Sequence, residues 1–293
     1  MKKIYFFLKM FIPHSLLEKM RLYYYSMVRK RIPAISETEF KDILINRLGL
    51  KKGRDVFIHS SITLLKTEFS VARIIPVIRE IVGEDATILF PSTHFSGRAE
   101  DYLKNKNSVF NVQTSHSVFG LLPELARREK DAVRSWHPTY PVVAIGKNAV
   151  AYIENQHKDK YPCGKLSPYY KLMERDALVI GIGVNSHYCT FVHCIEDSKE
   201  YKFPVETLLP DIFNARVQFP SKEIIIVETF AAHPRIKHRS VPVFFKKHIP
   251  EHIAKDININ GVPYFFAKAR ELYYEMGKLA EKNITIYSKK AYK

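Results

Sequence analysis

The stretch ALVIGIGVNSHYCTFVHCIED, residues 177–197, decides the fold because it joins an apolar run to a dense polar segment. Residues 177–184 are typical of a strand buried on both faces, as in the centre of a helix-covered sheet. Residues 185–197 then hold two His, two Cys, a Thr and a Glu–Asp pair. In an open α/β sheet, ligands bind beyond the carboxyl ends of the strands. The stretch therefore predicts a central strand and, directly after it, a site.

Strands and helices alternate on both sides of this stretch. Further apolar runs at 56–59, 86–91, 141–146 and 223–228 indicate strands. Helical periodicity separates them, with a capping box at Ser36 and Glu39 and a Ser-Pro start at Ser167. We expect an α/β fold whose central sheet is mixed but largely parallel, with helices on both faces. The predicted helices cover 36–50, 70–83, 119–129, 167–176 and 265–283.

Length and composition favour one large domain with its own core, since 46% of the 293 residues are apolar. We expect a basic, aromatic, helical extension over 1–35 and one domain over 36–293, in which 230–260, rich in His and Pro, forms an insertion or lid. The three cysteines form no CxxC pair, which indicates a reducing compartment and a cytoplasmic protein.

The net charge of +16 is concentrated near the start, where residues 1–33 hold eight Lys or Arg and one Glu. Lys9 and Pro13 interrupt the apolar residues, so the segment is not typical of a signal peptide. A basic aromatic segment of this kind suits peripheral contact with the inner face of an anionic membrane. The alternative is a helix that packs on its own domain or on the second subunit of a homodimer.

Residues 185–197 taken alone are either an ordinary polar loop or a site, and three kinds of chemistry fit a site there. One is a zinc site, although the spacing matches no common zinc motif. Another is a cysteine nucleophile at Cys194, with His137 or another distant His as its base. Against both, free cysteines are commonly buried core residues. The side chains that a zinc site would use are His187, Cys189, His193 and Cys194.

The third kind is acid/base chemistry by His193 and Glu196, which lie three residues apart and so share one face of a helix. Thr190 is a good N-cap residue, and a helix that begins there places His193 in its first turn. The positive end of the helix disfavours imidazolium, so the ring stays neutral and works as a general base.

Polar residues also follow two other predicted strands, as HSS at 59–61 and STHFSG at 92–97. The segment VRSWHPTYPVVAIG at 133–146 holds the only Trp of the chain and is stiffened by two prolines. Arg134 within it either binds a phosphate or neutralises Asp131. We expect the ends of the three strands to converge on one site.

Five segments occur in an order that resembles the aminoglycoside (antibiotic) N-acetyltransferase family, over residues 38–283. They are VFIHSS, SHSVFGLLPELARR, VRSWHPTYPVVAIG, CGKLSPYYKLMERDALVIGIGVNSHYCTFVHCIE and GVPYFFAKARELYYEMGKL. The resemblance implies that family's α/β fold, acetyl-CoA or another acyl-CoA as co-substrate, no metal, and transfer of the acyl group to an amine.

The resemblance also implies roles for individual residues. His193 is the expected general base, Glu196 the carboxylate that orients it or holds the acceptor's ammonium, and Thr190 a site hydroxyl. The residues that match the coenzyme A side of the family are Ser60, Ser61, Phe119, Gly120, Arg134, Ser135 and His137.

The charge bears on the acceptor, because a +16 protein does not attract polycationic aminoglycosides unless its cleft is locally acidic. We therefore expect a nucleotide-linked or lipid-linked amino sugar of surface polysaccharide synthesis. Antibiotic modification, resembling resistance enzymes, is the alternative. A non-enzymatic nucleic-acid-binding protein is a second alternative, although the basic residues form no recognition motif.

Overall fold

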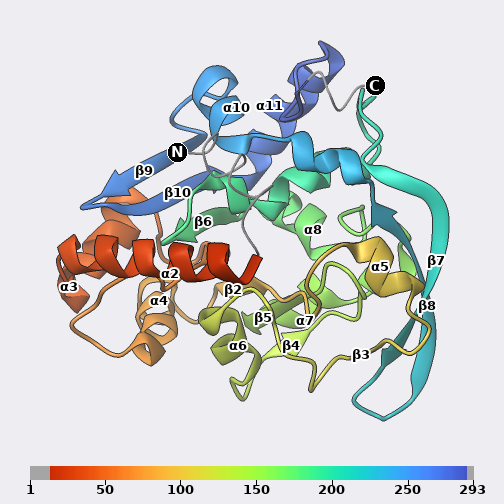
Figure 1. The fold of residues 1–293 in the computed structure, drawn as a ribbon, viewed down its shortest axis with the longest axis horizontal. Helices are drawn as coiled ribbons and strands as arrows, with labels where there is room; N and C mark the ends of the chain where they lie inside the picture. The colour runs from red at the N-terminus through yellow and green to blue at the C-terminus, as the bar shows by residue number, and fades with distance from the viewer. Residues whose placement is uncertain (1–13, 289–293) are drawn as a thin grey trace.

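A seven-stranded sheet forms the centre of the computed structural model, which describes residues 14–288 (Figure 1). The strand order is β4-β5-β2-β1-β6-β10-β9. The strands are β1 Val56–Ser60, β2 Thr87–Pro91, β4 Val133–Arg134, β5 Val142–Gly146, β6 Leu178–Ile182, β9 Ala254–Ile259 and β10 Val262–Lys268. The strands predicted at 56–59, 86–91, 141–146 and 177–184 are thus confirmed.

The mixed sheet is confirmed, but parallel pairing is confined to its middle. β1 pairs in parallel with β2 on one side and with β6 on the other. The outer pairs β2–β5, β4–β5, β6–β10 and β9–β10 are antiparallel. The expectation of a largely parallel sheet was wrong, because the chain returns to each flank by a hairpin or a reversed strand instead of a further crossover helix.

Helices cover both faces of the sheet, as predicted, and each face has its own core. One core packs α3, α4 and α6 against alternate strand residues such as Ile58 and Ile180, while the other packs α8, α10 and α11 against Phe57 and Val179. The helices are α2 His14–Arg31, α3 Glu37–Asp42, α4 Ile74–Val82, α5 Ala99–Lys104, α6 Leu121–Arg127, α7 Ala149–Ile153, α8 Pro168–Glu174, α9 Cys194–Asp197, α10 Val241–His248 and α11 Ala269–Glu281.

Both predicted helix starts are present. The Ser36 hydroxyl accepts a hydrogen bond from the Glu39 amide at 3.2 Å, and the Glu39 carboxylate accepts one from the Ser36 amide at 2.8 Å. The Ser167 hydroxyl accepts from the Tyr170 amide at 3.2 Å, with Pro168 in the first turn of α8. These caps satisfy amide groups that the first turn of a helix leaves without partners.

The region after α9 differs most from expectation. The run at 223–228 lies in β8 Ile224–Ala232, which belongs to a separate three-stranded sheet. In that sheet β7 Leu208–Gln218 lies in the middle and pairs with β8 on one side and with β3 Val109–Asn111 on the other. Residues 265–268 belong to β10, so the last helix begins at Ala269. Residues 230–260 hold the end of β8, α10 and the sheet strand β9, and α10 buries Phe244 and Phe245 in the main core. This segment is therefore built into the domain rather than added to it as an insertion or lid.

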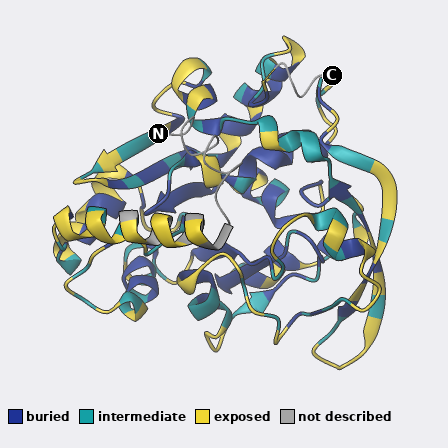
Figure 2. Ribbon diagram, in the orientation of Figure 1, coloured by how far each residue is buried: buried dark blue, intermediate teal, exposed yellow. Residues whose placement is uncertain are grey.

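Helix α2 lies over the front of the molecule and is mostly exposed, whereas the central strands are buried (Figure 2). The chain enters the domain through Ile32 and Ile35, which are both buried in the core on the α4 side. Residues 1–13 of the expected extension lie outside the described residues. Within 14–288, no helix is both long enough and apolar enough to cross a bilayer.

Candidate functional site

His193 and Glu196 form a buried pair behind the carboxyl end of β6. His193 Nδ1 lies 2.9 Å from Glu196 Oε2, and the two residues are 6% and 2% exposed. Thr190–His193 is a 3-10 helix that continues into the four-residue helix α9, so residues three apart face the same way. The predicted pairing of His193 with Glu196 is confirmed.

The contact with Glu196 bears on the tautomer of the imidazole. A carboxylate in its ionised form only accepts hydrogen bonds, so a neutral His193 ring in this contact would carry its proton on Nδ1 and donate it to Glu196 Oε2. Nε2 would then keep its lone pair, and it is the ring nitrogen that is not bound to Glu196. A neutral imidazole held in this tautomer is suited to accept a proton at Nε2.

Thr190 does not cap the helix as predicted. It is the first residue of the 3-10 helix, the residue before it is Cys189, and its buried hydroxyl lies beside the Tyr169 hydroxyl instead of capping a backbone amide. Since α9 has only four residues and His193 precedes it, the helix dipole has little influence on the ring. The carboxylate of Glu196, not the helix end, orients the imidazole.

A cleft of about 680 Å³ lies beyond the carboxyl ends of β1 and β6. Ser60 at the end of β1, Ser61 directly after it, Phe119 and Gly120 before α6, and Thr190 line it. His193 itself does not line it, but it follows Thr190 on the same short helix. The cleft and the His193–Glu196 pair therefore adjoin one another through Thr190.

The cleft also has walls that the sequence did not indicate. Tyr25 of α2 closes one side, and His187, the unassigned His of the polar segment, lines another. His59, at the end of β1, packs edge-on against Phe57 with ring centroids 4.9 Å apart. Burial lowers the pKa of His59 to about 3 and leaves its Nε2 without a partner, so the ring is neutral. His59 belongs to the HSS segment at 59–61, which was expected to face a site, although no role was assigned to the His59 ring.

The floor of the cleft is the point where β1 and β6 end side by side. The Ser61 amide donates a hydrogen bond to the Ile182 carbonyl at 2.9 Å. Gly183 follows with a φ of +71°, a conformation that favours glycine. A Cβ at Gly183 would lie 2.0 Å from the Ser61 carbonyl oxygen, so only glycine allows this close approach.

Three of the residues matched to the coenzyme A side lie away from the cleft lining and hold loops together. Arg134 is 6% exposed; Nη1 donates to the Ser115 carbonyl at 2.5 Å and Nη2 donates to the Ser92 carbonyl. It faces no carboxylate partner, and burial lowers its pKa to about 9. Arg134 does not neutralise Asp131, which pairs with Arg79 instead. Its guanidinium is used by backbone carbonyls rather than turned toward the cleft where a phosphate would bind.

Ser135 and His137 brace the same loop. The Ser135 hydroxyl accepts a hydrogen bond from the Val142 amide at 2.9 Å. His137 Nδ1 accepts from the Tyr140 amide, and its Nε2 lies 3.3 Å from the Thr229 hydroxyl of β8. Burial lowers the pKa of His137 to about 3, so this ring is neutral and fully used as a structural link.

The cysteines are core residues. Cys163, Cys189 and Cys194 are free and buried, and all three pack in the core on the α8 side. Burial raises the pKa of Cys189 to about 12 and that of Cys194 well above its usual range, which opposes formation of a nucleophilic thiolate. Within the described part of the chain, no three His, Cys, Asp or Glu side chains are grouped to hold a metal ion.

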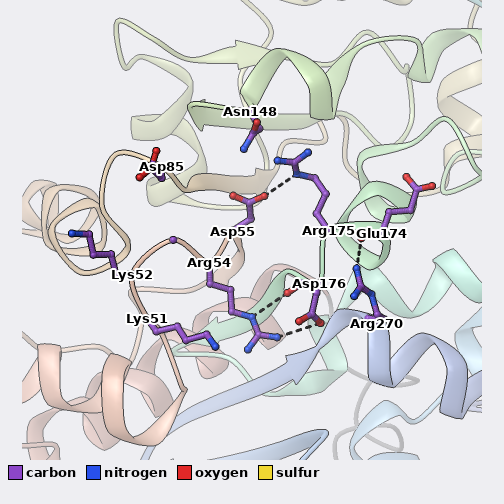
Figure 3. Close-up of a pocket in the computed structure, with 11 residues that line it drawn as sticks. Lys51, Lys52, Arg54, Asp55, Asp85, Asn148, Glu174, Arg175, Asp176 and Arg270 are labelled. Atoms are coloured by element: carbon purple, nitrogen blue, oxygen red, sulfur yellow. Dashed lines mark hydrogen bonds and ion pairs between the residues drawn. The ribbon is translucent and has the colours of Figure 1, made fainter.

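A second hollow, of about 550 Å³, lies at the opposite edge of the sheet (Figure 3). Two ion pairs lie in it, Arg175–Asp55 and Arg54–Asp176. The buried Asp55 carboxylate accepts from the Thr87 amide at 2.7 Å, the Tyr152 hydroxyl at 2.8 Å and Arg175 Nε at 3.1 Å. Arg54 donates to the Asp176 carbonyl. This hollow joins β1, β2 and α8, and none of the predicted site residues lies in it.

Comparison with known proteins supports the resemblance seen in the sequence. The family model described as aminoglycoside 3-N-acetyltransferase matches residues 57–280. The SPbeta prophage-derived aminoglycoside N(3')-acetyltransferase-like protein YokD of Bacillus subtilis (strain 168) is 28% identical over 181 residues, which are 56% of this chain and 65% of that protein. Aminoglycoside N(3)-acetyltransferase III of Serratia marcescens is 24% identical over 185 residues, which are 57% of this chain and 68% of that protein.

Solved structures share the fold. AAC-IIIb in its binary complex with CoASH superposes with a TM-score of 0.70 at 19% identity, over 87% of this chain and all of that one. YokD from Bacillus subtilis superposes with a TM-score of 0.68 at 23% identity, over 86% of this chain and 94% of its own. The match to YokD as a curated relative spans slightly less than two thirds of that protein's length. The family model, in contrast, covers well over half of the present chain. The protein belongs to the aminoglycoside 3-N-acetyltransferase family.

Proposed function

We propose that this protein transfers an acetyl or other short acyl group from an acyl-CoA to the amine of an amino sugar, with His193 as general base. The observation that carries the proposal is the 2.9 Å contact between His193 Nδ1 and Glu196 Oε2, which leaves Nε2 free to accept a proton. Membership of the acetyltransferase family supports the same reaction.

The reaction needs a base because only a neutral amine attacks a thioester. The amine nitrogen forms a bond to the carbonyl carbon, its proton passes to His193 Nε2, and the C–S bond breaks to release the coenzyme A thiolate. The thiolate then takes up a proton to give the free thiol. The Ser60 and Ser61 hydroxyls and the loop at Phe119 and Gly120 line the cleft in which the acyl donor would bind, and donors of this kind stabilise a thioester oxyanion.

The cleft favours an acceptor that is not a polycation. Among the described residues that line it there is no Asp or Glu, and its polar groups are hydroxyls, an amide and imidazoles. A net charge of +16 attracts anions over a long range. Both features support a nucleotide-linked or lipid-linked amino sugar, as in surface polysaccharide synthesis. The names of the relatives support the second candidate, an aminoglycoside.

Mass spectrometry of reactions with acetyl-CoA tests the acceptor. We expect a gain of one acetyl group on nucleotide-linked amino sugars, and turnover of kanamycin-type aminoglycosides at least ~100-fold slower, equivalent to about 2.7 kcal/mol of transition-state binding. Matched sugars that lack the amine are the controls. Efficient acetylation of aminoglycosides alone would refute the proposed acceptor but support the proposed reaction. Acetylation of neither class would contradict both.

Helix α2 supports a membrane-associated acceptor. Leu16, Met20, Tyr23 and Met27 recur at helical spacing and are 41–69% exposed, while Tyr25 of the same helix lines the cleft. The helix ends in three basic residues, Arg29, Lys30 and Arg31. An apolar stripe with flanking cations fits the surface of an anionic bilayer. We propose that this surface brings the cleft close to lipid-linked acceptors on the cytoplasmic face.

Sedimentation with vesicles tests this contact. The protein is expected to pellet with vesicles that contain phosphatidylglycerol but not with purely zwitterionic vesicles, because the attraction depends on anionic lipid. The double variant Met20→Glu, Met27→Glu should bind vesicles at least ~10-fold more weakly. In the wild type, these two apolar side chains would become buried in the bilayer surface and contribute about 2 kcal/mol or more to binding. Val150→Glu, an exposed apolar position on α7, is the matched control. Equal binding by the double variant and the control would refute the proposal.

A further inference from the structure

Glu196 has a second partner, which lies outside the residues that the family model matches. The hydroxyl of Tyr287 donates a hydrogen bond to Glu196 Oε1 at 2.8 Å, while Oε2 is bound to His193. Tyr287 is 6% exposed, and the family match ends at residue 280. The three side chains form a continuous chain from the phenol through the carboxylate to the imidazole.

The segment that carries Tyr287 is fixed at several points. It follows α11 and lies beside the segment before α10, where the Ser240 amide donates to the Ile286 carbonyl at 2.8 Å and the Ser288 amide donates to the His238 carbonyl at 2.9 Å. The backbone of Tyr287 forms an isolated antiparallel β-bridge with that of Arg239. Its ring packs in the main core, edge-on to Phe203. The phenol is therefore held in place against Glu196.

We propose that Tyr287 is a positioning residue for the acyl-transfer reaction, which holds Glu196 so that Glu196 holds His193 in the Nδ1–H tautomer. The inference rests on the function proposed above. Each Glu196 oxygen already has a buried protein partner, so the carboxylate orients the base rather than binding the acceptor's ammonium. Of the two roles that the sequence left open for Glu196, the contacts favour the first.

The surroundings keep the phenol protonated. Burial and the adjacent Glu196 raise the pKa of Tyr287 well above its usual range, so it remains a donor. Asp197 on α9 is buried beside Glu196, and burial raises its pKa to about 7. The other titratable or charged groups near the unit are Tyr140, Arg239, Cys163 and Cys194. None of these groups makes a hydrogen bond to either Glu196 oxygen.

Replacing Tyr287 with Phe tests the role, because it removes one hydroxyl and keeps the ring that packs in the core. We expect kcat to fall on the order of tenfold, the effect of losing one hydrogen bond to a charged group, with an unchanged KM for acetyl-CoA. The carboxylate, no longer shared, would hold a proton on the imidazole more tightly. The acid limb of the pH–rate profile should therefore move to higher pH.

Tyr273→Phe is the matched control. The Tyr273 hydroxyl also donates to a carboxylate, that of the exposed Glu200 at 2.7 Å, and its ring lies in the same core, but the hydrogen bond of His193 is to Glu196 and not to Glu200. We expect this variant to lose stability without a shift of the pH profile. In addition, Tyr287→Phe should have little further effect on kcat when Glu196 is already Gln, because the two residues act in series.

Nitrogen NMR of the His193 ring gives a measurement that does not depend on activity. The wild-type ring should show the Nδ1–H tautomer, and Tyr287→Phe should introduce exchange with the Nε2–H form, while Tyr273→Phe leaves the spectrum unchanged. Equal effects of the two Phe variants on kcat, pH profile and tautomer would refute the positioning role. A tautomer change in a protein that transfers no acyl group would uphold the contact but refute the proposed function.

Discussion

Replacing His193 with Gln should lower kcat about 10³–10⁴-fold and leave the KM for acetyl-CoA nearly unchanged. Gln is close to His in size and still forms hydrogen bonds, but it cannot accept the proton of the attacking amine. The acyl donor is expected to bind Ser60, Ser61 and the loop before α6, which line the cleft, whereas His193 does not line it. Steady-state rates of thiol release, with acetyl-CoA varied, measure both constants.

The pH dependence separates loss of the base from general damage. The wild-type rate should rise with pH as the imidazole loses its proton, whereas the variant should lack this limb because it has no base that titrates. His252→Gln, an exposed position, is the matched control and should behave as the wild type. If His193→Gln keeps more than about a tenth of the wild-type kcat, an effect of under 1.4 kcal/mol, His193 is not the base.

Replacing Gly183 with Ala should destabilise the protein by about 2–5 kcal/mol and raise the KM for acetyl-CoA. Two effects combine here, since the positive φ strains any residue with a Cβ and the new methyl group meets the Ser61 carbonyl oxygen at 2.0 Å. Relief of this clash separates the ends of β1 and β6 and so displaces Ser61 from the cleft. Denaturant unfolding and steady-state kinetics measure the two consequences.

Gly53→Ala separates strain from collision. Gly53 also has a positive φ, +78°, but a Cβ there meets nothing within 4 Å, and the residue lies at the other end of β1. We expect a loss of about 1–2 kcal/mol, the cost of the left-handed conformation alone, with unchanged kinetics. Equal stability losses in the two variants would show that β1 and β6 tolerate the added methyl group.

Local patterns in the sequence predicted the features that depend on neighbouring residues. Four central strands, the Ser36–Glu39 capping box and the start of α8 at Ser167 follow from apolar runs and caps. The contact between His193 and Glu196 follows from a separation of three residues, which holds in a 3-10 helix as well as in an α-helix. The family was also predicted correctly, because five motifs agreed in order.

Features that depend on distant residues were not predicted. Tyr287 lies 91 residues after Glu196 in the sequence, so no spacing rule connects them. Arg134 and His137 have residue types typical of ligand binding, but long-range contacts to Ser92 and Thr229 use them inside the protein. Sequence similarity alone does not distinguish a residue that lines a cleft from one that braces the loop behind it.

One missed element did have a local signal. The hairpin β9–β10 turns at Asn260 and Gly261, which both have positive φ, and an Asn-Gly pair is a strong predictor of a tight hairpin turn. The apolar residues after it were instead assigned to the helix that follows, because Phe265 and Phe266 also fit a helical period. Turn chemistry should have outweighed periodicity at this position.

The pairing of β1 with β6 has a consequence for how the protein folds. Residues 61–177 separate the two strands, and Asp55 and Arg175, near their amino ends, are 120 residues apart in the sequence. Closing a loop of this length is entropically costly and slow compared with forming the helices inside it. Because Ser61, Gly183 and the 3-10 helix that leads to His193 come into register only with this pairing, we expect the cleft to form late in folding. A partly folded chain, however helical, would then lack the proposed site.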